Sequence, residues 1–467
     1  MSEKPPLNVF LLTSIIVGTI LSIRNWPFLV EYGFSSVVYL LLAALIFFLP
    51  VSFVSAELAS GWPQRGGIYV WVREALGEKF AFLAVWLLWI ANVVWYPTIL
   101  SFITATLLSA FAPHMTHNPY LNVALMLALF WGILIPNFAG IRYSGWFSAI
   151  TLIAGTLIPG AAIIAFGGIW LASGNPSQIV FSLESLIPKE THLNELIFFV
   201  GVLLSFFGME MNAVHAKDVA NPKKNFPRAI FLSAVLITIL FIFGTLSIGV
   251  AIPKEKINLV TAVMEAISHY LNAWNLGWLL PIFSLMIAFG ACGGISIWLV
   301  GSSKTLLIAS ESGRLPPFMC RTNQHGVPTP ILVLQGIIVS GLTFVFFAMP
   351  NTSSAFWVLN LLSSQLNLLM YAFMFIAAIA LRYKHPDVHR FYTIPGGNWG
   401  MWTMSGLGLV VCLFCFSIGF IPPAQIHIGS LVFYESFLIF AILIFCAVPF
   451  FLFIPFVKIK VLKEPFH

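Results

Sequence analysis

The chain has 467 residues, of which 60% are hydrophobic and only 8% are charged, with a formal net charge of +6. A water-soluble domain carries about 25% charged residues. The composition therefore excludes a protein solvated by water alone, and we expect the lipid bilayer to surround most of the chain. No linker rich in glycine, serine or charge divides the sequence, so residues 1–467 are predicted to form a single transmembrane domain. Because excess positive charge is typical of membrane-protein loops, no nucleic-acid partner is expected.

A helix that crosses a membrane needs about 20 mostly apolar residues. Twelve segments of this chain meet that requirement, near residues 8–30, 34–58, 80–111, 119–137, 145–172, 195–215, 227–252, 275–308, 328–349, 353–382, 401–421 and 429–457. We therefore predict an all-α polytopic membrane protein with twelve transmembrane helices. No small-residue cleavage site follows a short apolar core at the N-terminus, so the first helix is expected to be retained.

Lysine and arginine indicate how these helices are oriented. If the N-terminus lies in the cytoplasm, 18 of the 22 lysines and arginines fall on the cytoplasmic side. Only Lys189, Lys254 and Lys256 fall outside, and Arg24 lies within a span. Cytoplasmic loops carry the excess of basic residues in membrane proteins. Both termini are therefore predicted to be cytoplasmic.

Two spans contain interruptions where a spanning helix should be continuous. These are Val17-Gly18-Thr19 in the first span and Ser205-Phe206-Phe207-Gly208-Met209-Glu210, with the break at Gly208, in the sixth. Unwound backbone within a bilayer is tolerated only where it lines a cavity or is buried in protein. A matched pair of breaks in the two halves of a chain is a pointer to a transporter's substrate site. The pairing also fits two inverted five-helix repeats, at about 8–172 and 195–383, followed by two extra helices at about 401–457.

Three ionisable residues lie near these interruptions. Glu210 directly follows the second, where a carboxylate could bind a cation, carry a proton or brace the freed backbone. Arg24 follows the first and either contacts a substrate carboxylate, acts as a gate, or snorkels to the outer interface beside Trp26. His215, at the cytoplasmic end of the sixth span, is either a pH sensor or a solvated interfacial histidine.

Other motifs argue against an enzyme. The sequence contains no metal-ligand spacing, nucleophile elbow or phosphate loop, so we expect no enzymatic activity, no metal and no cofactor. Cys412 and Cys415 have the spacing of a redox motif, but apolar residues surround them and core packing is the expected role. Glu57, near the inner end of the second span, is expected to pair with a basic residue of a loop.

The chain resembles the amino acid–polyamine–organocation (APC) superfamily and, within it, the bacterial glutamate/GABA antiporters. The motifs that carry the resemblance are, in chain order, Pro50-Val51 with Ala56-Glu57-Leu58-Ala59, Gly66-Gly67-Ile68-Tyr69-Val70-Trp71-Val72, Gly208-Met209-Glu210, Ala213-Val214-His215, Asn221-Pro222, Ile252-Pro253, Trp298-Leu299-Val300-Gly301, Asn323 with Gly326-Val327-Pro328, Lys384-His385-Pro386-Asp387, Ile394-Pro395-Gly396-Gly397 and Pro422-Pro423. The resemblance covers nearly the whole chain.

This resemblance implies a LeuT-like five-plus-five inverted repeat with two extra C-terminal helices, in the bacterial inner membrane. It places the substrate between spans one, six, eight and ten. Carried over by position, the substrate-binding residues are Val17, Gly18, Thr19, Ser205, Phe206, Phe207, Gly208, Gly294, Asn367 and Tyr371, with Glu210, Arg24 and His215 as candidates for gating or proton coupling. The chain departs from the group at Gly293-Gly294, Asn367 and Arg24, where the group has a carboxylate, a tyrosine and an aromatic residue respectively.

We therefore predict a secondary active transporter that exchanges an amino acid for a related amino acid or its decarboxylated amine by alternating access. The expected partners are a small amino acid or amine and the lipid bilayer. A proton-coupled amino acid symporter is the first alternative. A membrane-embedded enzyme or a non-transporting sensor is an alternative of another class. Monomer and homodimer both remain open.

Overall fold

The computed structural model describes residues 7–64, 66–116, 118–139, 150–189, 196–212, 219–310, 315–423, 426 and 429–452. Over these residues the named elements are all helices, and the one extended pairing is an isolated bridge between Leu7 and Val219. Ten helical stretches in the described part of the chain are long and apolar enough to cross a membrane. The prediction of an all-α polytopic membrane protein is confirmed, whereas the count of twelve spans stays a prediction.

The helices follow one another along the chain with short connections. The α-helices are α1 (Val9–Ile20), α2 (Ser36–Ala43), α3 (Leu49–Gly61), α4 (Ile68–Leu76), α5 (Glu78–Phe111), α6 (Pro119–Asn137), α8 (Ile158–Ala172), α9 (Leu183–Leu186), α11 (Phe198–Leu204), α12 (Met209–Asn212), α13 (Pro222–Ala251), α14 (Ala262–Ala273), α15 (Leu280–Ser310), α16 (Thr329–Thr343), α17 (Val345–Ala348), α18 (Thr352–Lys384), α19 (Gly397–Ile418) and α20 (Leu431–Leu452). Shorter 3-10 or π segments are η1 (Ile23–Ser35), η2 (Ala44–Phe48), η3 (Pro113–Met115), η5 (Ile153–Leu157), η7 (Lys254–Lys256), η8 (Gly277–Leu279) and η9 (Pro317–Cys320).

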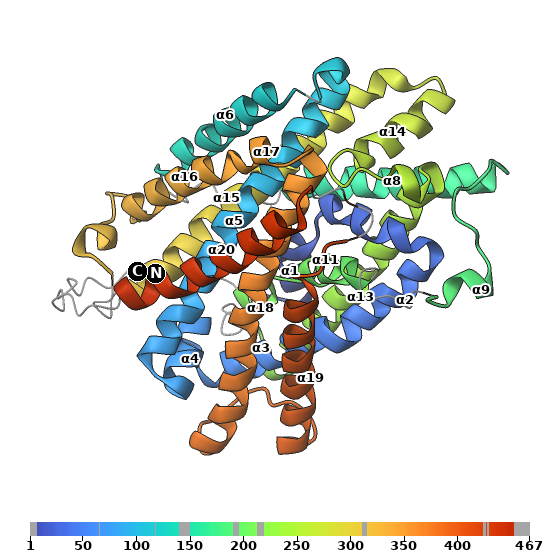
Figure 1. The fold of residues 1–467 in the computed structure, drawn as a ribbon. Coiled ribbons are helices and arrows are strands. Elements are labelled where there is room, and N and C mark those ends of the chain that lie inside the picture. The colour runs from blue at the N-terminus through green and yellow to red at the C-terminus, as the bar shows by residue number, and fades with distance from the viewer. Residues whose placement is uncertain are drawn as a thin grey trace.

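Helix α5 forms the centre of the bundle. In the most apolar 18-residue stretch of α5, 94% of the residues are buried, compared with 28% in the corresponding stretch of α6 and 17% in that of α20. Figure 1 shows α5 running diagonally through the molecule, and it packs against both α15 and α18. Helices α6 and α16 pack together at one edge. Because α6 and α20 bury so little of their surface, their apolar side chains are available to lipid.

The polar side chains of α5 are compatible with this buried position. The hydroxyl groups of Thr98, Ser101 and Thr104 each donate a hydrogen bond to a carbonyl three residues earlier, at 2.7–2.9 Å. Each of these three hydroxyls is therefore satisfied within its own helix, which removes most of the cost of burying it. Small hydroxyl residues also allow neighbouring helices to approach closely.

One close helix crossing involves two glycines. A Cβ atom added to Gly155 in η5 would lie 2.2 Å from the Cα atom of Gly290 in α15. No side chain fits between backbones at that distance, so the contact requires glycine in both helices. The crossing fixes η5 against α15 on one wall of the cavity described below.

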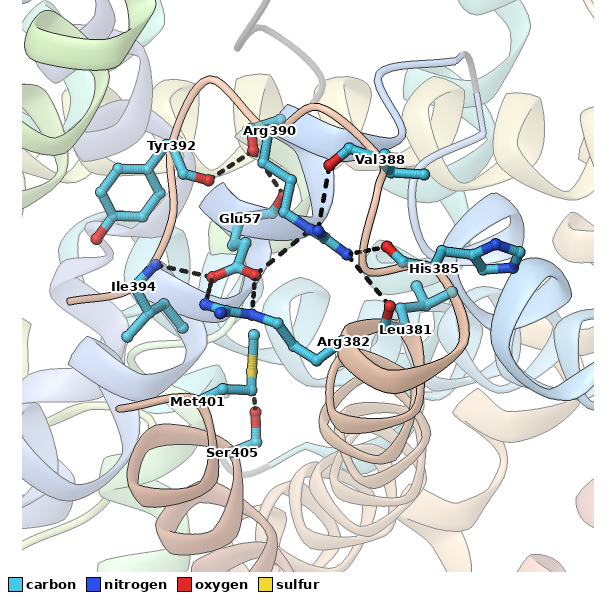
Figure 2. A network of polar contacts seen from close by, with 11 residues as sticks. Glu57, Leu381, Arg382, His385, Val388, Arg390, Tyr392, Ile394, Met401 and Ser405 are labelled. Atoms are coloured by element: carbon cyan, nitrogen blue, oxygen red, sulfur yellow. Dashed lines mark hydrogen bonds and ion pairs between the residues drawn. The ribbon is translucent and has the colours of Figure 1, made fainter. Parts of the chain in front are cut away.

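A buried carboxylate holds together the end of the bundle near α4. Glu57, in α3, accepts hydrogen bonds from Arg382 Nε at 2.5 Å and Arg382 Nη2 at 2.6 Å (Figure 2). It also accepts one from the backbone N–H of Ile394 at 2.8 Å, and Arg390 Nε lies 3.6 Å away. The side chain of Glu57 is only 2% exposed. Glu57 thus ties α3 to α18 and to the segment before α19, and the expected pairing with a loop base is confirmed by Arg390.

Replacement of Glu57 by glutamine should destabilise the protein strongly. The variant leaves two poorly exposed arginines without their carboxylate, and removing one partner of a buried ion pair costs about 3–5 kcal/mol. Glu74→Gln is the matched control, because Glu74 pairs with Arg73 on the surface, where such a pair contributes about 0–1 kcal/mol. The measurement is the melting temperature in detergent. Equal melting temperatures for the two variants would contradict the assigned role of Glu57.

Candidate substrate site

The first interruption begins later than the sequence suggests. Helix α1 continues through Val17-Gly18-Thr19 and ends at Ile20, and the backbone becomes extended at Leu21 and Ser22 before η1 begins. The predicted break at residues 17–19 is therefore wrong by about one turn. Gly18 has a packing role instead, since an added Cβ atom would lie 2.7 Å from the Leu152 side chain.

The second interruption begins at Ser205, as predicted, and ends at Gly208, because Met209 and Glu210 already belong to helix α12. Helix α11 ends at Leu204, residues 205–208 form turns, and α12 begins at Met209. Gly208 has a φ of +114°, a conformation that residues with a side chain rarely adopt. An added Cβ atom would also lie 3.1 Å from the Trp298 ring. Both the backbone conformation and the available space therefore require glycine here.

The two interrupted segments touch each other inside the bundle. The hydroxyl of Thr19, at the end of α1, lies 3.2 Å from Asn212 Oδ1 in α12. The Asn212 side chain also donates a hydrogen bond to the carbonyl of Gly208 at 3.0 Å. Neither segment is a continuous rod, and their polar groups face one another.

A cavity of about 120 Å³ lies at this meeting point. A single buried water needs about 10–15 Å³, so the volume suits a small organic molecule. Its polar lining consists of Thr19, Ser22, Arg24, Asn25, Asn92, Thr151, Thr156, Glu210, Ser363 and Asn367. Aromatic side chains also contribute, namely Trp95, Phe102, Phe207 and Trp298. Convergent polar groups in a largely apolar pocket are typical of a small-molecule site.

The predicted site residues divide into two groups. Those that line the cavity are Gly18, Thr19, Phe207, Gly294 and Asn367, together with Glu210 and Arg24. Those that do not line it are Val17, Ser205, Phe206, Gly208 and Tyr371. His215 lies outside the described residues.

The second group surrounds the broken helix instead of facing the cavity. Phe206 stacks on Phe48 with ring centroids 5.0 Å apart. The Ser205 hydroxyl donates to the Gly201 carbonyl at 3.2 Å. These contacts buttress the turn at residues 205–208.

Sequence reasoning missed the contribution of α5. Asn92, Trp95, Ile99 and Phe102 all line the cavity, and their spacing of three or four residues places them on one helix face. An asparagine within a strongly apolar span was the available signal, because polar groups in a membrane are costly and tend to face the interior.

Tyr371 connects α18 to the second interruption. Its phenol donates a hydrogen bond to Glu210 Oε2 and accepts one from the backbone N–H of Gly208 at 3.1 Å. Its ring packs against Phe207, with centroids 5.0 Å apart, and against Phe47 at 5.5 Å. Glu210 thus braces the broken helix, which is one of the roles considered from the sequence, and it also lines the cavity.

Arg24 is buried and does not reach the membrane interface. It is 2% exposed, and the neighbouring Trp26 is fully buried against Gly244 of α13. Arg24 Nη1 donates to Thr98 Oγ1 at 2.7 Å and lies 3.5 Å from Asn360 Oδ1. The snorkelling hypothesis is therefore wrong, because η1 turns this segment towards the interior of the bundle.

The guanidinium also lies against aromatic rings. Its central carbon is 5.3 Å from the centroid of Trp95 and 5.4 Å from that of Phe356. Contacts between a cation and ring faces are favourable when both are desolvated. They stabilise the buried charge without neutralising it.

A polytopic helical protein with a polar cavity between two interrupted helices has the features of a carrier of small molecules. Comparison with known families agrees: the model for amino acid permeases matches residues 7–460. The chain therefore belongs to this family of the APC superfamily and is a multi-pass amino acid transporter.

Individual relatives match over almost their whole length. An uncharacterised transporter of Legionella pneumophila is 41% identical, with 96% of each chain covered. A glutamate/gamma-aminobutyrate antiporter of Lactococcus lactis is 30% identical, with 96% of this chain and 90% of the relative covered. A probable agmatine/putrescine antiporter of the same species is 23% identical, over 84% and 82% respectively.

Gly208→Leu should abolish transport while the protein remains in the membrane. Leucine cannot adopt the positive φ without strain, and its side chain would overlap Trp298. Gly132→Leu is the control, because Gly132 is exposed on α6 with no atom near an added Cβ. Uptake by proteoliposomes that contain equal amounts of each variant is the measurement. Normal uptake by Gly208→Leu would contradict this assignment.

Gly294→Leu should block transport by a different route. Gly294 lines the cavity, and no atom lies within 4 Å of an added Cβ, so a leucine would project into empty space. We expect melting temperature to be nearly unchanged and uptake to fall at least about tenfold, because the side chain occupies the substrate's volume. Gly168→Leu, on the exposed side of α8, is the control. Undiminished uptake by Gly294→Leu would show that the cavity is not the substrate site.

Proposed function

We propose that this chain is an antiporter that exchanges an amino acid for a related amino acid or for its decarboxylated amine. The meeting of two interrupted helices at one cavity is the observation that carries the proposal. Two of the relatives are named as antiporters, one for glutamate and gamma-aminobutyrate and one for agmatine and putrescine. The first pair is an example of the proposed exchange, because gamma-aminobutyrate is the decarboxylated form of glutamate, whereas the second pair consists of two amines.

The cavity offers partial negative charge and neutral polar groups to the ammonium end of an amino acid. The last carbonyls of a helix have no partner within it and carry partial negative charge. Helix α1 ends at the cavity wall, so its carbonyl end is suited to a substrate ammonium group. Thr19 and Asn367 provide neutral polar side chains, and Phe207 covers one side. We assign substrate binding to these residues together with Gly18 and Gly294.

The architecture that supports this function is a pair of inverted repeats, at about 8–172 and 195–383, with extra helices at about 401–457. We propose that the ten long helices, together with the interrupted segments at α1 and at α11–α12, form the twelve spans. We propose cytoplasmic termini from the distribution of lysine and arginine. Transport would then proceed by rocking one helix bundle against the other around the cavity.

Glu210 favours a second candidate function, proton-coupled symport. This carboxylate is 4% exposed, lines the cavity and accepts a hydrogen bond from Tyr371. An acidic side chain within the membrane is a natural proton carrier. In a symporter it would bind a proton together with the substrate, whereas in an antiporter it would serve the substrate's ammonium group and the broken helix.

Counterflow in proteoliposomes tests the proposal. Purified protein is reconstituted, vesicles are loaded with unlabelled amino acid, and uptake of labelled glutamate or gamma-aminobutyrate is followed without a pH gradient. We expect uptake to require an amino acid or amine inside the vesicle, because an antiporter returns only when loaded. Protein-free vesicles and Gly208→Leu vesicles are the controls.

The same vesicles separate the two candidates. A proton symporter would fill empty vesicles when only an inward proton gradient is imposed, and an antiporter would not. Uptake into empty vesicles under that gradient would replace the antiporter by the symporter. Failure of a full panel of amino acids and amines to enter under either condition would overturn both.

A further inference from the structure

The cavity contains a buried positive charge that the described chain does not neutralise. No carboxylate among the described residues lies within 4.0 Å of Arg24. Its Nε atom is buried and has no hydrogen-bond partner. The other deeply placed arginines, Arg382 and Arg390, share Glu57. The protein thus provides a carboxylate for its structural arginines and leaves the one in the cavity without one.

A buried guanidinium in this state is costly. An uncompensated charge in a low-dielectric interior loses its hydration, and one hydroxyl, one amide oxygen and two ring faces recover only part of that loss. Guanidinium N–H groups form a fixed fork that matches the two oxygens of a carboxylate. A carboxylate that enters the cavity would therefore supply the missing partner.

Exchange between an amino acid and its decarboxylated amine limits which carboxylate of the substrate can pair with Arg24. Decarboxylation at Cα removes the α-carboxylate and leaves the amine and any side-chain carboxylate. A site that accepts both compounds must recognise the groups they share. For an acidic amino acid these are one ammonium and one side-chain carboxylate, separated by a short carbon chain.

We propose that Arg24 binds the side-chain carboxylate of the substrate and thereby selects acidic amino acids and the monocarboxylate amines derived from them. This inference rests on the proposed exchange function and names its substrate class. The substrate ammonium lies towards Glu210 and the carbonyl end of α1, which are the negative groups of the cavity wall. Diamines are rejected, because they bring a second positive charge to a buried guanidinium. The selectivity therefore matches a glutamate/gamma-aminobutyrate exchanger and not an agmatine/putrescine exchanger.

A gate role for Arg24 predicts a different pattern. Through Thr98 and Asn360, Arg24 connects η1 to α5 and α18. If this tether were its only role, a neutral substitution would slow transport of all substrates by the same factor. Recognition of a carboxylate instead changes the ratio between substrates that differ only in that group. The ratio of acid transport to amide transport, and not the overall transport rate, therefore distinguishes carboxylate recognition from a gate role.

The test compares each acid with its neutral amide in counterflow competition. Glutamate is paired with glutamine, and gamma-aminobutyrate with its amide, with putrescine as the diamine. Hydrogen bonds to charged groups predict that wild-type protein prefers each acid by about 10- to 100-fold. We expect Arg24→Gln to reduce that preference to near unity and Arg24→Lys to retain part of it. Arg73→Gln, at an exposed position of α4, is the control and should keep the wild-type ratio.

The outcomes separate this inference from the proposed function. If wild-type protein exchanges no amino acid or amine, the proposed function fails. If it exchanges them but takes amides or putrescine as well as the acids, only the role of Arg24 is overturned. An unchanged acid-to-amide ratio in Arg24→Gln that still transports glutamine overturns it as well. Should Arg24→Gln fail to fold, the wild-type panel and Arg24→Lys still decide the result.

Discussion

A broken helix survives inside a membrane only if its freed peptide groups find partners, and the phenol of Tyr371 meets that constraint here. It accepts a hydrogen bond from the N–H of Gly208 and donates one to Glu210, so a single hydroxyl satisfies the backbone on one side and a carboxylate on the other. Because Tyr371 belongs to α18, which packs along the central helix α5, the position of the break is coupled to the most buried part of the bundle. The bond thereby holds in place the turn at residues 205–208, which contributes Phe207 to the cavity wall.

The bundle treats its buried charges in two ways. At Glu57 the charges are closed: one carboxylate, two guanidinium groups and a backbone N–H form a set that joins three chain segments. At the cavity the buried charges are not paired with each other: Arg24 and Glu210 line the same space without an ion pair between them. Charges that are paired within the protein suit a fixed structural contact, because breaking a buried ion pair is costly. Charges without a partner in the protein suit a binding site in which a ligand supplies the partner.

The sequence predicts the membrane class, the position of most spans and the second break, because each depends on local composition or on a glycine next to an acidic residue. The sequence places the first break one turn too early, because Gly18 is a helical residue that packs against Leu152. This contact joins segments far apart in the sequence and cannot be seen from the local pattern. The burial of Arg24 also depends on more than the local sequence. The 3-10 backbone of η1 turns Arg24 inward, whereas the neighbouring Trp26 suggests a position at the membrane interface. The α5 face at Asn92 and Trp95 emerges only when the bundle is assembled.

An open charge also bears on why such a carrier would exchange its cargo and not simply release it. To change the side to which its cavity opens, the protein must pass through a closed state in which water is expelled. With the cavity empty, Arg24 would cross that state without a carboxylate partner, and burial of an unpaired charge is strongly unfavourable. With a bound carboxylate the pair is compensated and the crossing costs less. A ligand shifts a conformational equilibrium only by its differential affinity for the two states. If the side-chain carboxylate of the substrate binds the closed state more tightly than the open states, the loaded protein changes sides faster than the empty protein. A carrier that changes sides only when loaded performs strict exchange.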